Sequence, residues 1–170
     1  MLKRSKSFLF FLIIALNLCA DRLSKYFVRE YLPRGREVPV IGSFFVLRYA
    51  ENRGAFLSMG AGLPPVIHLI LLKILPAVVL VLMFLYVLFR IPGSRMQLAA
   101  FGCVIGGGVG NLLDRVFPDA EVVDFLLFRL GPLRTGILNI ADLSITVGCV
   151  LIFLTLRPGK PGPDAAGLQD

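Results

Sequence analysis

The chain has 170 residues, of which 56% are hydrophobic, and its mean hydropathy is +0.81. Soluble domains contain about 45–50% apolar residues even when glycine is counted, and here the excess is gathered in long runs, which argues against a soluble globular protein. The net charge of +7 is compatible with nucleic-acid binding, but no nucleic-acid motif accompanies it, and the basic residues flank apolar runs as they do beside anionic lipid headgroups.

The first apolar run follows a basic N-terminus, a pattern that is also typical of a secretory signal peptide. Leu18 stands where signal-peptide cleavage requires a small residue, and further apolar runs follow, so we interpret the run as a first membrane anchor. Since about 20 residues are needed to cross a bilayer, we predict a span at about 8–28, with its helix continuing toward Leu32. In that helix Asp21 and Lys25 are four residues apart and share a face.

The next segment changes in character. Prolines and glycines punctuate residues 33–65, and β-branched and aromatic residues fill the stretch from Val38 to Tyr49. We predict short strands outside the membrane in a strand-rich segment at 38–58. Its last residues, 52–58, are expected to form a turn or loop.

Three further apolar runs predict spans at 66–89, 96–113 and 136–156. Pro76 in the second span is tolerated in a membrane helix with a kink. The third span is rich in glycine. Its small residues at four-residue spacing let helix backbones approach closely in lipid; they are Gly102, Gly106 and Gly110.

Residues 114–136 are predicted to form an extramembrane loop, and the tail at 157–170, rich in Pro and Gly, to be disordered in the cytoplasm. Residues 1–156 then form one membrane-embedded domain. The predicted fold is that of an integral membrane protein, mainly α, with four transmembrane helices and a small extracytoplasmic β-sheet.

The distribution of basic residues favours one orientation. Those of the N-terminus, of the short loop between the second and third spans, and of the tail fall on one side, which the positive-inside rule assigns to the cytoplasm. Seven Lys and Arg between residues 21 and 65 lie on the other side and work against the rule. Because four spans bring both termini to one side, we expect both termini in the cytoplasm.

Polar residues gather where the predicted spans end on the side opposite the termini. Charges in membrane segments are costly and mark functional candidates. Asp142 begins an apolar helix, and capping of that helix is an alternative explanation for it. Asp124 stands alone among apolar residues, and an acid in a surface loop is the alternative there. The whole set is Asp21, Asn111, Asp114, Arg115, Asp124, Asn139 and Asp142.

Two carboxylates at one depth predict a specific chemistry. Close carboxylates cannot both ionise readily and therefore share a proton. The ionised one takes a proton from water as general base, and the protonated one donates to the carbonyl oxygen or the leaving amine. No metal or cofactor is required, and His68 has no acidic partner nearby for a serine-type triad. Cys19, Cys103 and Cys149 lack metal-ligand spacing. We predict an aspartyl peptidase.

Two other classes of protein remain open at this point. A small transporter also uses intramembrane Asp and Lys, but it predicts polar residues throughout the bilayer depth and internal repeats. A structural membrane partner would use the glycine-rich span for packing alone and would leave Asp124 and Asp142 without a role.

At these residues the chain resembles the lipoprotein signal peptidases, the bacterial type II signal peptidases, over nearly its whole length. Five motifs occur in that family's order. They are Asp21-Arg22-Leu23-Ser24-Lys25, Asn52-Arg53-Gly54-Ala55-Phe56, Gly107-Gly108-Val109-Gly110-Asn111-Leu112-Leu113-Asp114-Arg115, Val123-Asp124-Phe125 and Asn139-Ile140-Ala141-Asp142.

The resemblance implies an enzyme of the bacterial cytoplasmic (inner) membrane that removes the signal peptide from diacylglyceryl-modified prolipoproteins, cutting before the lipidated cysteine. Its partners would be these substrates and membrane lipid, without nucleic acid, and its active site would lie on the extracytoplasmic side. The catalytic residues would be Asp124 and Asp142. The residues that build or support the site would be Asp21, Lys25, Asn52, Gly54, Gly108, Asn111, Arg115, Asn139 and Ala141.

The sequence departs from the family pattern at three positions. Arg22 stands where Gln is more usual, and Leu138 stands where Phe is frequent. Phe56 places its aromatic ring one position earlier than the commoner motif does. None of these changes removes a catalytic group.

Overall fold

The structure, a computed structural model, describes residues 4–54, 59–60, 62–90, 94–116 and 121–155. The predicted disordered tail and Phe56 lie outside these residues. The helices are α1 (Arg4–Tyr31), α2 (Pro65–Leu69), the π-helical segment η2 (Ile70–Ile74), α3 (Leu75–Arg90), α4 (Arg95–Asp114) and α5 (Ile140–Thr155). The strands are β1 (Glu37–Ile41), β2 (Phe45–Asn52), β3 (Val122–Leu130) and β4 (Leu133–Arg134).

The prediction of a membrane protein is confirmed. Three helices are long and apolar enough to cross a bilayer, namely Ser5–Tyr31, Pro65–Arg90 and Arg95–Asp114. The fourth, α5, is apolar but has 16 described residues. At about 1.5 Å per residue it is shorter than a hydrocarbon core of about 30 Å.

The predicted start of the fourth span, at residue 136, is wrong. The helix begins at Ile140, because the backbone before it bonds to β3 in an extended conformation. The Leu138 N–H donates to the Leu126 carbonyl oxygen at 2.8 Å, and the Leu126 N–H donates back at 2.7 Å. A backbone held in a strand ladder cannot also start a helix.

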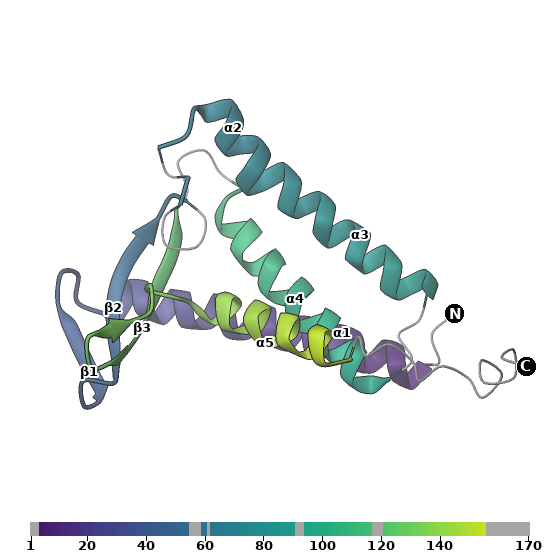
Figure 1. Cartoon of the computed structure of the whole chain (residues 1–170), viewed down its shortest axis with the longest axis horizontal. Coiled ribbons are helices and arrows are strands. Elements are labelled where there is room, and N and C mark those ends of the chain that lie inside the picture. Colours follow the sequence, from purple (N-terminus) through teal and green to yellow (C-terminus); the bar gives the residue numbers. More distant parts are fainter. Residues whose placement is uncertain (1–3, 55–58, 61, 91–93, 117–120, 156–170) are drawn as a thin grey trace, which may run out of the picture.

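Helix α4 is central to the membrane part, since it packs against α1, α3 and α5 (Figure 1). The predicted glycine stripe of α4 faces α1: a Cβ on Gly102 would lie 2.9 Å from Cγ2 of Ile13, and one on Gly106 would lie 2.9 Å from Cβ of Asn17. The packing role that the spacing predicted is therefore confirmed.

Helices α4 and α5 approach each other almost backbone to backbone. A Cβ on Gly107 would lie 2.5 Å from the carbonyl oxygen of Ala141. A Cβ on Gly148, in α5, would lie 2.7 Å from the carbonyl oxygen of Ala100. Such close contacts are available only to glycine, and they hold the start of α5 against the end of α4.

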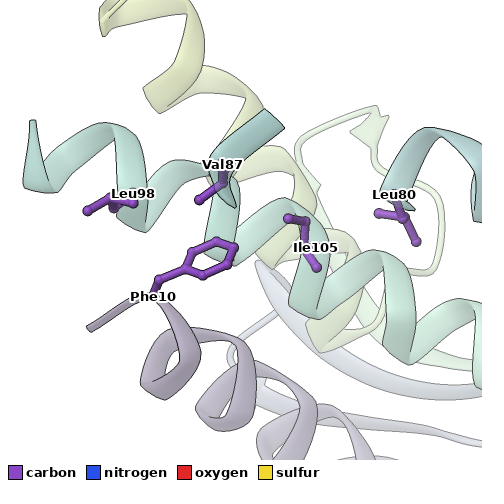
Figure 2. Close-up of a cluster of buried hydrophobic side chains, with 5 residues drawn as sticks. All are labelled: Phe10, Leu80, Val87, Leu98 and Ile105. Carbon is purple, nitrogen blue, oxygen red and sulfur yellow. The ribbon is translucent and has the colours of Figure 1, made fainter. Parts of the chain in front are cut away.

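An apolar cluster joins α1, α3 and α4 (Figures 1 and 2). Figure 2 shows the Phe10 ring directed toward side chains of α3 and α4. The members of this cluster are Phe10, Leu80, Val87, Leu98 and Ile105.

A kink was expected at Pro76, and the structure has a wider, π-helical segment, η2, just before this proline. Pro76 has no N–H, and its ring would clash with the carbonyl group of Leu72 in a regular α-helix. The turn before it is π-helical, and the Leu75 N–H donates to the carbonyl oxygen of Ile70, five residues earlier. The π-helical turn thus accommodates the proline.

The sheet is antiparallel in the order β1-β2-β3-β4 and lies across the end of α1 (Figure 1). The prediction of strands at 38–58 is confirmed for β1 and β2. The prediction of a loop at 114–136 is wrong, because this segment supplies β3 and β4. Strand β3 is a largely buried apolar run whose partner, β2, lies about seventy residues earlier in the chain, as in the pair Asn52–Val122.

We predict that Gly148→Ala destabilises the protein by about 1–3 kcal/mol, the usual cost of an extra methyl group in a packed interface. The reason is the clash with the Ala100 carbonyl oxygen, since backbone cannot move aside as a side chain can. Thermal unfolding in detergent measures the effect. Gly62→Ala is the matched control, because a Cβ on Gly62 meets nothing within 4 Å. Equal melting temperatures for both variants would contradict the close approach.

Candidate active site

Four charged side chains form an ion cluster, made of Asp21, Arg22 and Lys25 of α1 and Asp114 of α4; three of them are buried, and Arg22 is half-buried. Lys25 is 1% exposed, and its Nζ lies 2.8 Å from Oδ1 of Asp21 and 2.6 Å from Oδ2 of Asp114. Arg22 contacts the same two carboxylates, each at 2.7 Å. Two carboxylates and two cations cancel, so the ion cluster carries no net charge into the protein interior.

The ion cluster also holds backbone atoms of α4 and α5. Nη2 of Arg22 donates to the carbonyl oxygen of Gly110 at 2.8 Å. The N–H of Ala141, in the first turn of α5, donates to Oδ1 of Asp21 at 3.2 Å. The free N–H groups of a helix N-terminus favour a carboxylate, so Asp21 fixes the place where α5 begins.

Asp142 and Asn139 form a reciprocal cap at the start of α5. The Asp142 N–H donates to Oδ1 of Asn139 at 2.9 Å, and the Asn139 N–H donates to Oδ2 of Asp142 at 3.1 Å. This is the geometry of a capping box, with its members three residues apart. Asp142 therefore does cap α5, and the cap also fixes the direction of its carboxylate.

Asp124 of β3 lies opposite this cap and is held by two amides. Nδ2 of Asn52 donates to Oδ2 of Asp124 at 2.9 Å, and Nδ2 of Asn139 donates to Oδ1 at 2.7 Å. The pKa of the Asp124 carboxyl is raised to about 6, chiefly by burial. The hydrogen bond from Asn52 opposes this rise, and the neighbouring Asp142 carboxylate adds to it. The proton affinity of Asp124 is therefore well above that of an ordinary aspartate.

The side chains of Asn111 and Asn139 connect the two carboxylates to each other and to the ion cluster. Nδ2 of Asn111 donates to Oδ1 of Asp142 at 2.7 Å. Oδ1 of Asn111 accepts from Nδ2 of Asn139 at 3.1 Å and from Nζ of Lys25 at 3.1 Å. Since Asn139 also bonds to Asp124, one amide touches both carboxylate-bearing residues.

The loop after β2 is fixed by Arg115, the residue that follows α4. The Gly54 N–H donates to Oδ1 of Asn52 at 2.9 Å, which closes a short turn. Nη2 of Arg115 donates to the carbonyl oxygen of Gly54 at 2.8 Å, and Nη1 donates to that of Asn111 at 2.9 Å. Arg115 therefore ties the loop that orients Asn52 to the helix that orients Asp142.

A largely apolar cavity of about 320 Å³ opens beside Asp142. It lies between the π-helical turn with the start of α3 on one side and α4 with α5 on the other. Gly108 lines it, and a Cβ there would lie 2.5 Å from Cδ2 of Leu80, so α3 can approach α4 closely at this level. The complete lining is Leu71, Leu72, Pro76, Gly108, Asn111, Leu112, Arg115, Asp142, Ile145 and Thr146.

The structure brings the sequence-predicted residues into one network at the end of the bundle next to the sheet. Asp124 and Asp142 are linked by amides, and the expected pair of Asp21 and Lys25 is present. Gly108 stands apart from these hydrogen bonds and contributes through the cavity.

Sequence reasoning missed the part played by Arg22, which the motif comparison treated only as a departure. It also missed a second polar group one turn deeper, where the Ser144 hydroxyl bonds to Asn17 and lies 2.9 Å from the Cys103 carbonyl oxygen. The available signal was spacing: Asn17 precedes Asp21 by four residues and therefore shares its helix face.

The chain is similar to proteins of known family along most of its length. A family model described as signal peptidase (SPase) II matches residues 13–157. A lipoprotein signal peptidase of Chlorobium phaeovibrioides is 39% identical over 168 residues, which cover 94% of this chain and 94% of that protein. One of Clostridium acetobutylicum is 32% identical over 151 residues, covering 88% and 95%.

Solved structures have the same fold. A bacterial membrane enzyme determined by the in meso method at 2.3 Å resolution has a TM-score of 0.77 and 26% identity, covering 86% of each chain. A second bacterial membrane enzyme, determined by the same method at 1.9 Å, has a TM-score of 0.76 and 25% identity, covering 89% of this chain and 94% of that one.

We predict that Lys25→Met lowers the stability by about 3–5 kcal/mol, since it leaves two buried carboxylates facing Arg22 alone. Unfolding in detergent, followed by circular dichroism, measures the loss. Arg29→Met is the control, because Arg29 is an exposed cation one turn later in α1. A loss no larger than that of the control would show that the ion cluster does not hold the helices together.

The raised pKa of Asp124 predicts a pH dependence of stability. An aspartate in the unfolded chain has a pKa of about 3.9, so between roughly pH 4 and 6 the folded chain binds this proton more readily than the unfolded chain. The stabilisation is complete below this window and is lost as the pH rises through about 6, by about 3 kcal/mol in all.

The comparison of wild type with Asp124→Asn across pH 4–7 isolates this dependence, because the variant cannot titrate there. We expect the difference in unfolding free energy between the two to change across the window. Glu30→Gln, at an exposed acid, should follow the wild type. If the unfolding free energies of wild type and Asp124→Asn change in parallel with pH, the pKa of Asp124 is not raised.

Proposed function

Because this chain belongs to the signal peptidase (SPase) II family, whose members cleave signal peptides from prolipoproteins as aspartic peptidases, we propose that Asp124 and Asp142 are its catalytic pair. The observation that carries the proposal is the arrangement of these two carboxylates. Asp124 accepts from the side-chain amide of Asn139, Asp142 accepts from the Asn139 backbone N–H, and Asp142 lines an apolar cavity.

In the first step one carboxylate is ionised and the other protonated, as expected for two neighbouring acids that share a proton. The ionised carboxylate takes a proton from a water molecule held between the two. The water oxygen then adds to the carbonyl carbon of the scissile peptide bond. The protonated carboxyl donates its proton to the carbonyl oxygen, which gives a neutral tetrahedral diol.

In the second step the diol collapses. A diol hydroxyl returns its proton to one carboxylate, the carbonyl re-forms, and the bond from carbon to nitrogen breaks. The other carboxyl protonates the departing nitrogen, so the products are a carboxylic acid on the signal peptide and a free amine on the mature protein. The pair ends with one shared proton, as it began.

The remaining predicted residues would orient this pair and do not take part in bond making. Asn52, Asn111 and Asn139 donate to the carboxylates and fix their planes. The ion cluster sets the positions of α4 and α5 on which these amides depend. The positioning residues of the proposal are Asp21, Lys25, Asn52, Gly54, Gly108, Asn111, Arg115, Asn139 and Ala141.

The cavity beside Asp142 supports an apolar substrate. Its walls are mostly aliphatic, and Asp142, Asn111 and Arg115 supply the charged and amide groups of the lining. This is suited to a substrate whose scissile bond is polar and whose neighbouring groups belong in lipid. We propose that the bond cut is the one before a diacylglyceryl-modified cysteine.

The proposed orientation has both termini in the cytoplasm and the catalytic pair on the extracytoplasmic side. The start of α1 and the end of α5 lie at one end of the molecule, and the sheet lies at the other (Figure 1). Basic residues occur at the start of α1, at the end of α3 and at the start of α4, as the positive-inside rule expects for a cytoplasmic side; they are Arg4, Lys6, Arg90 and Arg95.

We predict that Asp124→Asn and Asp142→Asn each lower the rate of cleavage by at least roughly a hundredfold, the lower range for loss of general acid–base catalysis. The assay is cleavage of a diacylglyceryl-modified prolipoprotein by the purified protein in detergent. Asparagine keeps one acceptor oxygen at each site, so the cap of α5 is retained and the fold can be checked by its melting temperature.

Glu30→Gln, at an exposed acid near the end of α1, is the matched control and should cut as the wild type does. If folded Asp124→Asn or Asp142→Asn cuts at the wild-type rate, the catalytic pair is assigned wrongly. If the wild type removes the signal peptide at a different bond, the pair can stand while the proposed cleavage position fails.

A further inference from the structure

The two tight turns of the sheet lie at one end of its strands, and this end is apolar and exposed. The β1–β2 turn and the β3–β4 turn lie together, since the Arg129 N–H donates to the Phe44 carbonyl oxygen at 2.8 Å. Gly131 has a φ of +59°, which permits the sharp turn between Leu130 and Leu133. We call this surface the sheet-edge patch; it consists of Ile41, Phe44, Leu130, Leu133 and Arg134.

The exposure of the sheet-edge patch is high for aliphatic side chains. Leu130 is 72% exposed, Leu133 is 71% exposed, and Ile41 is 60% exposed. Single exposed apolar residues are common on proteins, but a contiguous group of them marks a surface that contacts another molecule or a membrane. A pocket of about 230 Å³ between the two turns is lined by Phe44, Leu130, Leu133 and other residues of this edge.

The end of α1 indicates the depth of the sheet-edge patch. Tyr26, Phe27 and Tyr31 are exposed in the last turns of α1, and their rings contact one another. Exposed Tyr at the end of a membrane helix is typical of the headgroup level of the bilayer. Val28, in the same turns, packs against Val123 and other residues of β3, so the sheet lies at this level as well.

The sheet-edge patch carries a positive charge that is suited to a phospholipid headgroup. Arg134 is exposed, and its guanidinium has no ion-pair partner among the residues that the structure describes. Arg129 pairs with Glu37 at 2.5 Å, so its charge is matched within the protein. Arg134 therefore presents a free positive charge next to Leu133, which is the combination found in segments that lie in a membrane interface.

We propose that the sheet-edge patch inserts its aliphatic side chains into the outer leaflet of the bilayer and that Arg134 binds the phosphate of anionic phospholipids there. This contact lies away from the catalytic pair and would hold the sheet at a fixed depth beside the membrane. The partner is the lipid surface itself.

The chain contains no tryptophan, so a single introduced indole reports on one position. Leu133→Trp, in full-length protein reconstituted in bilayers with brominated acyl chains, should lose fluorescence by quenching. Leu82→Trp, at an exposed position of α3, is the control for a lipid-facing site, and Arg36→Trp, in the turn before β1, is the control for a water-facing site. We expect Leu133→Trp to be quenched as Leu82→Trp is; emission unchanged by bromine, as for Arg36→Trp, would overturn the proposal.

The role of Arg134 is tested in the Leu133→Trp background with brominated phosphatidylglycerol compared with brominated phosphatidylcholine. We expect a roughly fivefold preference for the anionic lipid, equivalent to about 1 kcal/mol for one arginine at a membrane surface. Arg134→Gln should abolish this preference and Arg36→Gln should keep it. A preference that survives Arg134→Gln would contradict the assignment of the headgroup contact.

A second copy of the chain is the other possible occupant of this edge. In that case the indole of Leu133→Trp would be shielded from bromine, and its emission would shift when the protein is diluted with excess lipid, which would also overturn the proposal. No substrate is present in these measurements. Their outcome is therefore independent of whether the peptidase assignment is right.

Discussion

The ion cluster of α1 and α4 is the constraint on which the rest of the site depends. Lys25 is almost completely removed from solvent, so its charge is tolerable only beside Asp21 and Asp114, and these carboxylates in turn need two cations. Arg22 supplies the second. Because the four groups belong to α1 and α4, the two helices can pack in only one register, and the contact from Asp21 to Ala141 extends that register to α5.

The catalytic pair of the proposal is held by neutral amides, and the charged side chains of the ion cluster lie beyond these amides. This division has a physical reason. A cation bonded directly to Asp124 or Asp142 would stabilise the ionised form of both and oppose the sharing of a proton. Amides orient a carboxylate with a weaker effect on its proton affinity, and burial can then keep the pKa of Asp124 near 6. Asn111 connects Lys25 to Asp142 and so fixes the position of this carboxylate without a direct bond from the cation.

The local signals in the sequence were sufficient for much of the fold and for the candidate residues. Apolar run lengths predicted the membrane helices, because the thickness of the hydrocarbon core sets a minimum length that composition alone reveals. The i, i+4 spacing of Asp21 and Lys25 predicted their contact, and glycine spacing predicted the close packing of α4. The motifs around Asp124 and Asp142 pointed to the acids that the fold brings together. All of these depend on residues near one another in the chain.

Contacts between distant segments were decided only by the tertiary structure. The run around Asp124 was taken for a loop, since a buried strand needs a partner, and β2 is remote in sequence. The start of α5 was placed too early, because the pairing of Leu138 with β3 competes with helix formation. The sequence by itself determined a membrane protein with acids at one end of its helices. Which atoms bind those acids, and that Arg22 completes the ion cluster, depended on how α1, α4 and the sheet meet in space.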